Sequence, residues 1–266
     1  MMNNDIDLNL DHNIRRIPHV LRARGWRLYT EKGRLIDLWQ YGGRAILGHN
    51  PPGMLRAIKN SAERGLYAPH PHIAEDRFCK ALAVLLPGRA FRVYESEAFL
   101  KQVVSQAQLE PVLWRPFLDK SAQNALQTKP VLLPVLPFPF PGAPAVLAID
   151  AEKSSVLEKL PTSQLLSPVA LAAAARCIYD LIASPKRGTP HFPKTDKAVK
   201  KSTVWKRQGI YLYYTGTADS YAELFKCFLE GGFLLPPTVK DPAILPGEMS
   251  PGEEAKLVKL MEEKVL

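Results

Sequence analysis

Long apolar runs are absent from this sequence. No stretch approaches the roughly 18–20 consecutive apolar residues that a transmembrane helix requires. The opening residues, MMNNDIDLNLDHN, are too polar for the apolar segment of a secretory signal peptide. We therefore expect no membrane association, and a cytoplasmic location follows as the default.

Cysteine is scarce as well. Three cysteines lie in apolar stretches with helical spacing, which predicts buried, reduced thiols: Cys79, Cys177 and Cys227. No Cys-x-x-Cys pair and no cluster of cysteine with histidine is present, so no metal site is predicted. His70 and His72 lack a third ligand nearby and are expected in a solvated loop.

The composition that remains is that of a soluble globular protein. The 266 residues are 46% hydrophobic and 23% charged, enough for one large or two small domains. The net charge is +9, and much of the excess lies in one run: Lys186, Arg187, Lys194, Lys197, Lys200, Lys201, Lys206 and Arg207. Because Pro185, Gly188, Pro190 and Pro193 interrupt this run, a solvated linker is predicted. Aromatic residues are few there, so nucleic-acid binding is a weakly indicated alternative.

The most position-specific pattern runs from Gly25 to Pro52. Apolar and aromatic residues at 26–29 and 35–39 flank a turn at 31–34, which predicts a two-stranded hairpin. A glycine-rich loop follows the hairpin and contains Gly42, Gly43 and Gly48. It leads into a predicted helix that begins near Pro52.

The order of these residues resembles the N-terminal segment of class III (subgroup II) aminotransferases, with the glutamate-1-semialdehyde aminomutase branch the most similar. The matching positions are Gly25, Gly33, Asp37, Ile46, Leu47, Gly48, His49, Pro52, Gly65, Pro69, Glu75 and Leu82 to Gly88. The resemblance implies fold type I, the fold of enzymes that use pyridoxal phosphate (PLP). It also implies that the glycine loop forms a wall of a substrate cleft. Gly43 and Arg44 are the candidate substrate contacts there, and Arg44 is suited to a carboxylate.

A second match follows the strand predicted at 90–94. The family motif Asn-Ser-Gly-Ser-Glu-Ala holds the PLP phosphate at a helix N-terminus. Ser96, Glu97 and Ala98 match it, which makes Ser96 and Glu97 the candidate cofactor residues. Glu95 stands where the family has glycine, and a carboxylate there both fills space and repels a phosphate. A helix N-cap at Ser96 explains the same residues without a ligand.

The lysine that binds PLP in this family is missing from its expected place. The segment Gly142 to Ala145 resembles the family's Gly-x-Pro-x-Gly-Ala, which places the lysine at Leu136 or Pro137. The alternative, Lys129, lies only ten positions after Asp119. A crossover between parallel strands takes about a dozen residues or more, so the family's arrangement of Asp and Lys does not fit this spacing.

Further landmarks flank the shortened centre. Ser167-Pro168 begins a predicted helix that resembles the one following the catalytic lysine, and Gly232 to Pro237 resembles an aminomutase strand. Ser250 to Glu253 forms a predicted capping box at the start of the last helix. Ile14, Ile17, Val20 and Leu21 are spaced for one face of an N-terminal helix.

The predicted fold is therefore α/β and fold-type-I PLP-transferase-like, with the small domain retained and the large domain strongly reduced. The predicted segments are an N-terminal lead (1–19), two small-domain parts (20–88 and 209–266), a large-domain remnant (89–185) and a basic linker (186–208).

The leading functional hypothesis is an aminotransferase-like protein that has lost PLP catalysis and binds no cofactor. It would act by binding another copy of itself, a fuller aminotransferase homologue or an amino-acid-like ligand. The first alternative is an active PLP-dependent aminotransferase or aminomutase that uses Lys129. The second is a basic nucleic-acid-binding protein that uses the run at 186–207.

Overall fold

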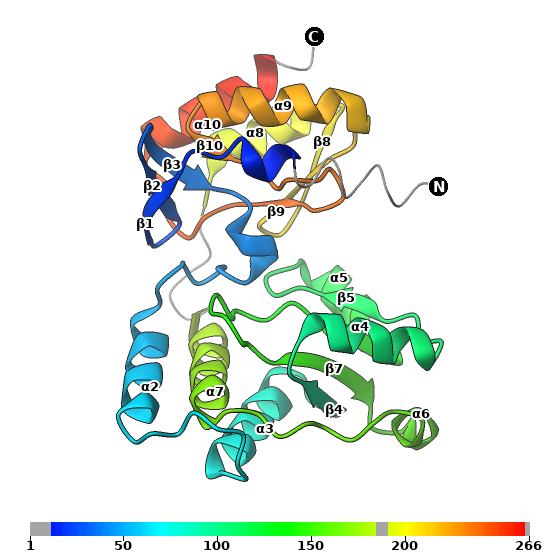
Figure 1. The fold of residues 1–266 in the computed structure, drawn as a ribbon. Coiled ribbons are helices and arrows are strands. Elements are labelled where there is room, and N and C mark those ends of the chain that lie inside the picture. The colour runs from blue at the N-terminus through cyan, green and yellow to red at the C-terminus, as the bar shows by residue number, and fades with distance from the viewer. Residues whose placement is uncertain (1–11, 185–190, 264–266) are drawn as a thin grey trace. The chain divides into compact units, whose positions relative to one another are not determined.

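The computed structural model describes residues 12–184 and 191–263 (Figure 1). The chain forms two compact units: unit 1 comprises Met1–His49 with Thr189–Leu266, and unit 2 comprises Asn50–Gly188. This division differs from the boundary after residue 88 that the sequence indicated. Residues 50–88 form helices α2 (Pro52–Ala62) and α3 (Ile73–Leu85), which pack on helix α7 (Pro168–Ala183) and so belong to unit 2.

Unit 1 contains two small sheets. The first has the strand order β1-β2-β3-β10, antiparallel except for the parallel pair β3 and β10. Its strands are β1 (Val20–Arg24), β2 (Arg27–Thr30), β3 (Gly33–Asp37) and β10 (Phe233–Leu234). The second is antiparallel with the order β11-β9-β8. Its strands are β8 (Trp205–Gln208), β9 (Tyr211–Tyr214) and β11 (Ala243–Ile244).

The hairpin predicted near the N-terminus is present as strands β2 and β3. Thr30 pairs with Gly33 across a two-residue turn. The Thr30 hydroxyl donates to the Gly33 carbonyl at 2.8 Å and accepts from the Lys32 amide at 3.2 Å. Val20 and Leu21, which the sequence placed on a helical face, instead lie exposed in strand β1. Val20 pairs with Thr30 of β2, and the register shifts between Val20 and Arg22, so Leu21 lies at an irregularity of the ladder.

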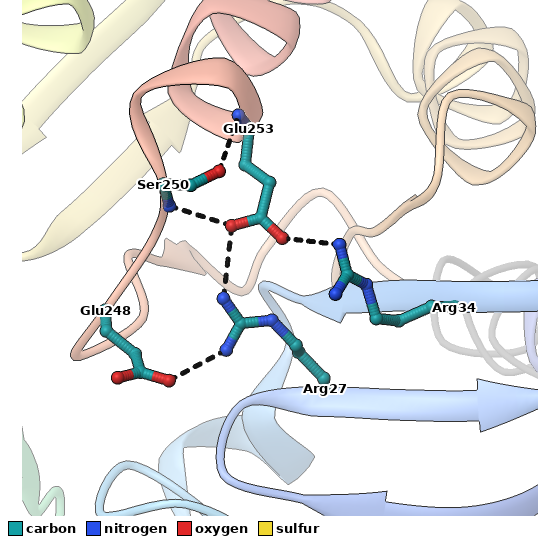
Figure 2. Close-up of polar contacts among 5 residues, drawn as sticks. All are labelled: Arg27, Arg34, Glu248, Ser250 and Glu253. Atoms are coloured by element: carbon teal, nitrogen blue, oxygen red, sulfur yellow. Dashed lines mark hydrogen bonds and ion pairs between the residues drawn. The ribbon is translucent and has the colours of Figure 1, made fainter.

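Three α-helices of nine or more residues accompany the sheets in the described part of unit 1. They are α8 (Pro193–Lys201), α9 (Ala218–Glu230) and α10 (Pro251–Glu263). The capping box predicted for α10 is confirmed, since the Glu253 amide donates to the Ser250 hydroxyl and the Ser250 amide to the Glu253 carboxylate (Figure 2). In Figure 1, α8, α9 and α10 gather on one side of the strands of this unit.

The basic run at 186–208 is not a simple linker. Its residues 185–190, including Lys186 and Arg187, lie outside the described residues, but the rest forms α8 and β8. Pro193 suits the first turn of a helix, and Thr195 and Ala198 are buried on the inner face of α8. Arg207 pairs with Asp196, which ties the strand to the helix.

Unit 2 is built on a four-stranded sheet with the order β4-β7-β6-β5. Its strands are β4 (Arg89–Tyr94), β5 (Val112–Trp114), β6 (Val131–Pro134) and β7 (Ala145–Asp150). Besides α2, α3 and α7, the unit contains α4 (Glu97–Gln106), α5 (Lys120–Gln127) and α6 (Ser154–Glu158). The strands at 90–94 and 145–150 and the helix start at Pro168 agree with the sequence-based prediction.

Helices cover both faces of this sheet, as the alternation along β7 shows. Leu147 and Ile149 pack in a cluster with Leu100 of α4, whereas Val146, which precedes Leu147, packs with residues of α3 and α7. Successive side chains of a strand point to opposite faces, so a fully apolar strand indicates burial on both sides.

The described residues contain no helix long and apolar enough to cross a membrane. Of the three cysteines, Cys177 is buried and Cys227 half-buried, but Cys79 is exposed on α3, which corrects its predicted burial. Cys79 follows the fully buried Phe78, so its side chain leaves the inner face of the helix.

Candidate functional site

The strands of unit 2 create one edge where ligands of α/β proteins commonly bind. Strand β7 runs antiparallel to both β4 and β6, and β5 runs parallel to β6. Therefore β4, β5 and β6 share one direction, and their carboxyl ends meet at one edge of the sheet. We call this the carboxyl edge; the segments that leave it are residues 95–97, 115–119 and 135–140.

The predicted cofactor residues Ser96 and Glu97 lie at this edge, at the start of α4. The Ser96 hydroxyl accepts a 3.1 Å hydrogen bond from the Phe99 amide and so caps the helix. The Glu95 amide donates to the side-chain carbonyl of Gln164 at 2.8 Å. Glu95 and Glu97 are both exposed.

A neighbouring segment of the same unit lies along the end of β4. The Val93 amide donates to the Ser163 hydroxyl at 3.0 Å, and the Gln164 amide donates to the Val93 carbonyl at 2.9 Å. The buried Tyr94 donates its hydroxyl to the Pro161 carbonyl at 3.0 Å. Residues 161–164 thus bond to the end of β4 and, through the Gln164 side chain, to the Glu95 amide of the turn. The sequence did not point to this contact, because it joins residues about 70 positions apart that no local pattern links.

Apolar side chains occupy the place at which the sequence resemblance puts the family's lysine. Leu136, two residues after the end of β6, is 5% exposed and belongs to a core cluster with Phe78 and Phe138. The rings of Phe78 and Phe138 lie 6.1 Å apart, and Phe140 lies 6.0 Å from Phe138. Strand β6 ends at Pro134, and the prolines that follow cannot donate the backbone hydrogen bonds of a sheet.

Lys129 lies at the other end of the sheet. It precedes β6, and its carbonyl accepts a 2.5 Å hydrogen bond from Arg89 at the start of β4. Ser96 follows the end of β4, so the strand separates Lys129 from Ser96 by roughly 20 Å at about 3.3 Å per residue. The structure therefore does not bring Lys129 to residues 95–97, the turn between β4 and α4. We call this turn the phosphate turn, because the family motif that it resembles holds the PLP phosphate. The lysine that follows a strand at the carboxyl edge is Lys120, exposed at the start of α5.

These positions do not fit PLP. The cofactor needs a lysine for its covalent bond, close approach of its phosphate to backbone amides, and an acid on the ring nitrogen. Leu136 stands at the lysine position, Glu95 replaces the glycine, and the Glu95 amide already has a partner.

The second candidate region is the loop from Asp37 to His49 in unit 1. Asp37 is 1% exposed, and one carboxylate oxygen accepts from the amides of Trp39 (2.9 Å) and Gln40 (2.8 Å). The other oxygen lies 2.7 Å from His49 Nε2. Both residues belonged to the sequence motif, but their pairing was not predicted, because twelve positions of irregular chain separate them.

The backbone of this loop is strained. Gln40 and Tyr41 adopt φ angles of 49° and 52°, a region that costs non-glycine residues roughly 1–2 kcal/mol each. Gln40 is fully buried and donates its side-chain amide to the Ile244 carbonyl at 3.0 Å. At Gly48, with φ of 94°, a Cβ would lie 3.1 Å from the Cα of Gly25, so a side chain has no room.

The predicted substrate residues Gly43 and Arg44 lie in this loop. Gly43 is buried with φ of 99°, and the half-buried Arg44 places its guanidinium 5.0 Å from the centre of the Tyr41 ring. The structure thus gathers Gly43 and Arg44 with the Asp37–His49 pair in unit 1. Ser96, Glu97 and Lys129 belong to unit 2.

Within the described residues, no group of three or more histidine, cysteine, aspartate or glutamate side chains could hold a metal ion. His72, one of the two histidines noted in the sequence, accepts a 3.1 Å hydrogen bond from the Ala74 amide and caps α3.

No protein-family model matches the chain. An uncharacterized protein of Treponema pallidum is 30% identical over 88% of this chain and 90% of its own length. Another, from Borreliella burgdorferi, is 23% identical over 96% of this chain and 93% of its own. The glutamate-1-semialdehyde 2,1-aminomutase of Pyrobaculum arsenaticum is 42% identical over 59 residues, which are 21% of this chain and 14% of the enzyme.

Solved structures with the same fold are aminotransferases. The ornithine δ-aminotransferase of Plasmodium falciparum matches with a TM-score of 0.66 and 12% identity over 97% of both chains. An omega-transaminase of Sphaerobacter thermophilus matches with a TM-score of 0.66 and 10% identity over 99% of this chain and 97% of the enzyme. These likenesses confirm the predicted α/β fold of PLP-dependent aminotransferases in a chain reduced to 266 residues. The chain belongs to the family of the Treponema pallidum protein, and its fold is that of the aminotransferases.

Proposed function

We propose that this protein is an aminotransferase-fold protein that has lost PLP catalysis and acts by binding. Its partners under this proposal are a second copy of the chain, a fuller aminotransferase homologue, or an amino-acid-like ligand whose carboxylate contacts Arg44 beside Gly43. Function depends on the groups at a site and not on the fold alone, so the fold by itself does not assign an activity.

One observation carries this proposal: Leu136, one of the two positions at which the sequence resemblance puts the family's lysine, lies buried in an apolar cluster. PLP chemistry requires a lysine that forms a Schiff base with the cofactor. A charged or amine side chain in that cluster would be desolvated against Phe78 and Phe138. Position 136 therefore belongs to the hydrophobic core of unit 2.

The phosphate turn supports the same proposal from a second direction. The carboxylate of Glu95 would repel a phosphate dianion, and its amide is bonded to Gln164. The Ser96 hydroxyl caps α4 by accepting from the Phe99 amide. The Glu95 amide and the Ser96 hydroxyl thus each have a hydrogen-bond partner within unit 2.

Borohydride reduction in the presence of PLP tests this proposal. The full chain is incubated with one equivalent of PLP, reduced, digested and analysed by mass spectrometry for pyridoxyl-lysine. We expect low, scattered modification of exposed lysines, with no single site modified stoichiometrically.

A stoichiometric adduct on one lysine would contradict the proposal and favour an active aminotransferase or aminomutase. If such an adduct forms, the variants Lys129→Ala and Lys120→Ala show which lysine carries it, because only substitution of the modified lysine abolishes the adduct. Lys101→Ala, an exposed lysine of α4, is the matched control.

A further inference from the structure

A broad hollow in unit 1 gathers charged side chains that neither the hairpin nor the glycine loop explains. Its volume is about 720 Å³, within the range of small-molecule sites. Five cationic side chains line it, together with two acidic ones: Arg16, Lys32, Arg34, Lys226, Lys256, Glu223 and Glu230. We call this the cationic hollow.

The cationic side chains come from separate elements of unit 1. Lys32 lies in the turn between β2 and β3, Lys226 on α9 and Lys256 on α10. The scaffold beneath them is fixed by backbone bonds, since the Ile36 amide donates to the Gly232 carbonyl at 2.9 Å. Groups carried on different elements of a rigid scaffold can approach one ligand from several sides.

The positive charge of the hollow is only partly neutralised. Arg34 pairs with Glu253 at 2.9 Å (Figure 2), and Arg16 donates to the Ala222 carbonyl at 3.5 Å. Across residues 12–184 and 191–263, Lys32, Lys226 and Lys256 form no ion pair within 4.0 Å. Unpaired like charges that share one hollow repel one another, and an anion placed among them relieves that repulsion.

Apolar surface accompanies the charges. Leu35 and Leu229 also line the hollow, with Pro18 at its N-terminal side. Charged side chains nevertheless dominate the lining, which suits a strongly charged ligand better than an apolar one. Ammonium groups act as point charges toward phosphate oxygens, so several lysines can contact different oxygens of one polyanion.

We propose that the cationic hollow binds a small polyanion that carries two or more phosphate groups. This assigns a ligand class to the binding role proposed above, but it depends on unit 1 alone. The test uses a probe that cannot form a Schiff base, so its failure leaves the loss of PLP catalysis standing.

Titration of the full chain with sodium tripolyphosphate, followed by calorimetry at low ionic strength, tests the inference. We compare the wild type with the triple variant K32A/K226A/K256A. The matched control is K197A/K200A/K206A, which removes three exposed lysines of α8 and β8 outside the hollow. All six side chains are exposed, so unfolding midpoints without ligand are expected to agree.

The expected result is one tripolyphosphate per chain, with affinity at least about tenfold weaker in the hollow variant and less than about threefold weaker in the control. Affinity should also fall as salt is added. Equal losses in the two variants would mean general attraction to a chain of net charge +9 and would overturn the proposal. So would retained binding in the hollow variant, or no binding by the wild type.

Discussion

The two units of this chain have kept different parts of the aminotransferase pattern. In unit 1 the motif residues contact one another. Asp37 accepts hydrogen bonds from the Trp39 and Gln40 amides and pairs with His49. Gly48 packs against the backbone of Gly25. Unit 2 retains the strand and helix starts, but its carboxyl edge is filled by its own side chains, with Leu136 in the core and Gln164 on the phosphate turn.

This difference separates residues that the fold itself requires from residues that only a ligand would require. Buried polar groups such as Asp37 are costly to leave without partners, so the loop they organise is specified by its own hydrogen bonds whether or not a substrate binds. Groups that contact only a ligand have no such support from the fold. Under the proposed loss of PLP catalysis, an apolar residue such as Leu136 can stand at such a position and stabilise the unit.

The largest expected effect is in unit 2, from Leu136→Lys. Burying an ammonium group among Phe78, Phe138 and their neighbours should lower the free energy of unfolding by at least about 3 kcal/mol. Leu113→Lys is the matched control, because Leu113 is 48% exposed on β5, and it should cost less than about 1 kcal/mol. Urea denaturation measures both. Equal small costs would show that position 136 can still accommodate a lysine.

In unit 1, Asp37→Ala should lower the free energy of unfolding by about 2–4 kcal/mol. The substitution leaves the amides of Trp39 and Gln40 without their acceptor and removes the partner of His49. Asp37→Asn keeps one acceptor and should cost less. Glu152→Ala, at an exposed carboxylate, should change the value by under about 0.5 kcal/mol. If Asp37→Ala changed the free energy of unfolding as little as Glu152→Ala, the stability of unit 1 would not depend on the hydrogen bonds of Asp37.

The contacts of Glu253 at the start of α10 should contribute about 1–3 kcal/mol. Glu253 accepts from Arg27 at 3.1 Å and Arg34 at 2.9 Å, and Arg27 also pairs with Glu248 (Figure 2). A double-mutant cycle of Arg27→Ala with Glu253→Gln measures the coupling of the pair. A coupling near zero would show that the capping box alone positions α10.

The same carboxylate predicts a dependence on pH. Burial alone would raise the pKa of Glu253, but hydrogen bonds from the Ser250 amide and Arg27 outweigh it and lower that pKa. The ionised Glu253 carboxylate therefore stabilises the folded state at pH values above its unfolded pKa of about 4.3. This stabilisation is lost as the pH falls through the lower pKa of the folded state. The difference in unfolding free energy between the wild type and Glu253→Gln should shrink below about pH 4.

The smallest expected effect is Tyr221→Phe in α9. The buried hydroxyl donates to the Pro236 carbonyl at 2.7 Å, and burial raises the pKa of Tyr221, so it stays protonated. Its loss leaves the carbonyl without that donor and should cost about 1 kcal/mol. Tyr67→Phe, at a side chain that is 63% exposed, should be neutral within a few tenths of a kcal/mol.

Local signals predicted much of this fold. The hairpin of β2 and β3, the Ser250 to Glu253 capping box and the helix start at Pro168 each depend on neighbouring residues, and each is present. Contacts between distant residues were not predictable from one sequence. Glu95 with Gln164, and Arg27 with Glu253, join segments that no periodicity connects. The prolines near 190 suggested a linker, although Pro193 begins helix α8.

The most direct test of lost PLP catalysis is the absorption spectrum of the full chain after incubation with excess PLP and exhaustive dialysis. We expect no retained Schiff-base band and less than about a tenth of an equivalent of PLP per chain, because Leu136 offers no amine and the Glu95 amide is bonded to Gln164. A stable band at one equivalent per chain, abolished by substitution of a single lysine, would contradict it.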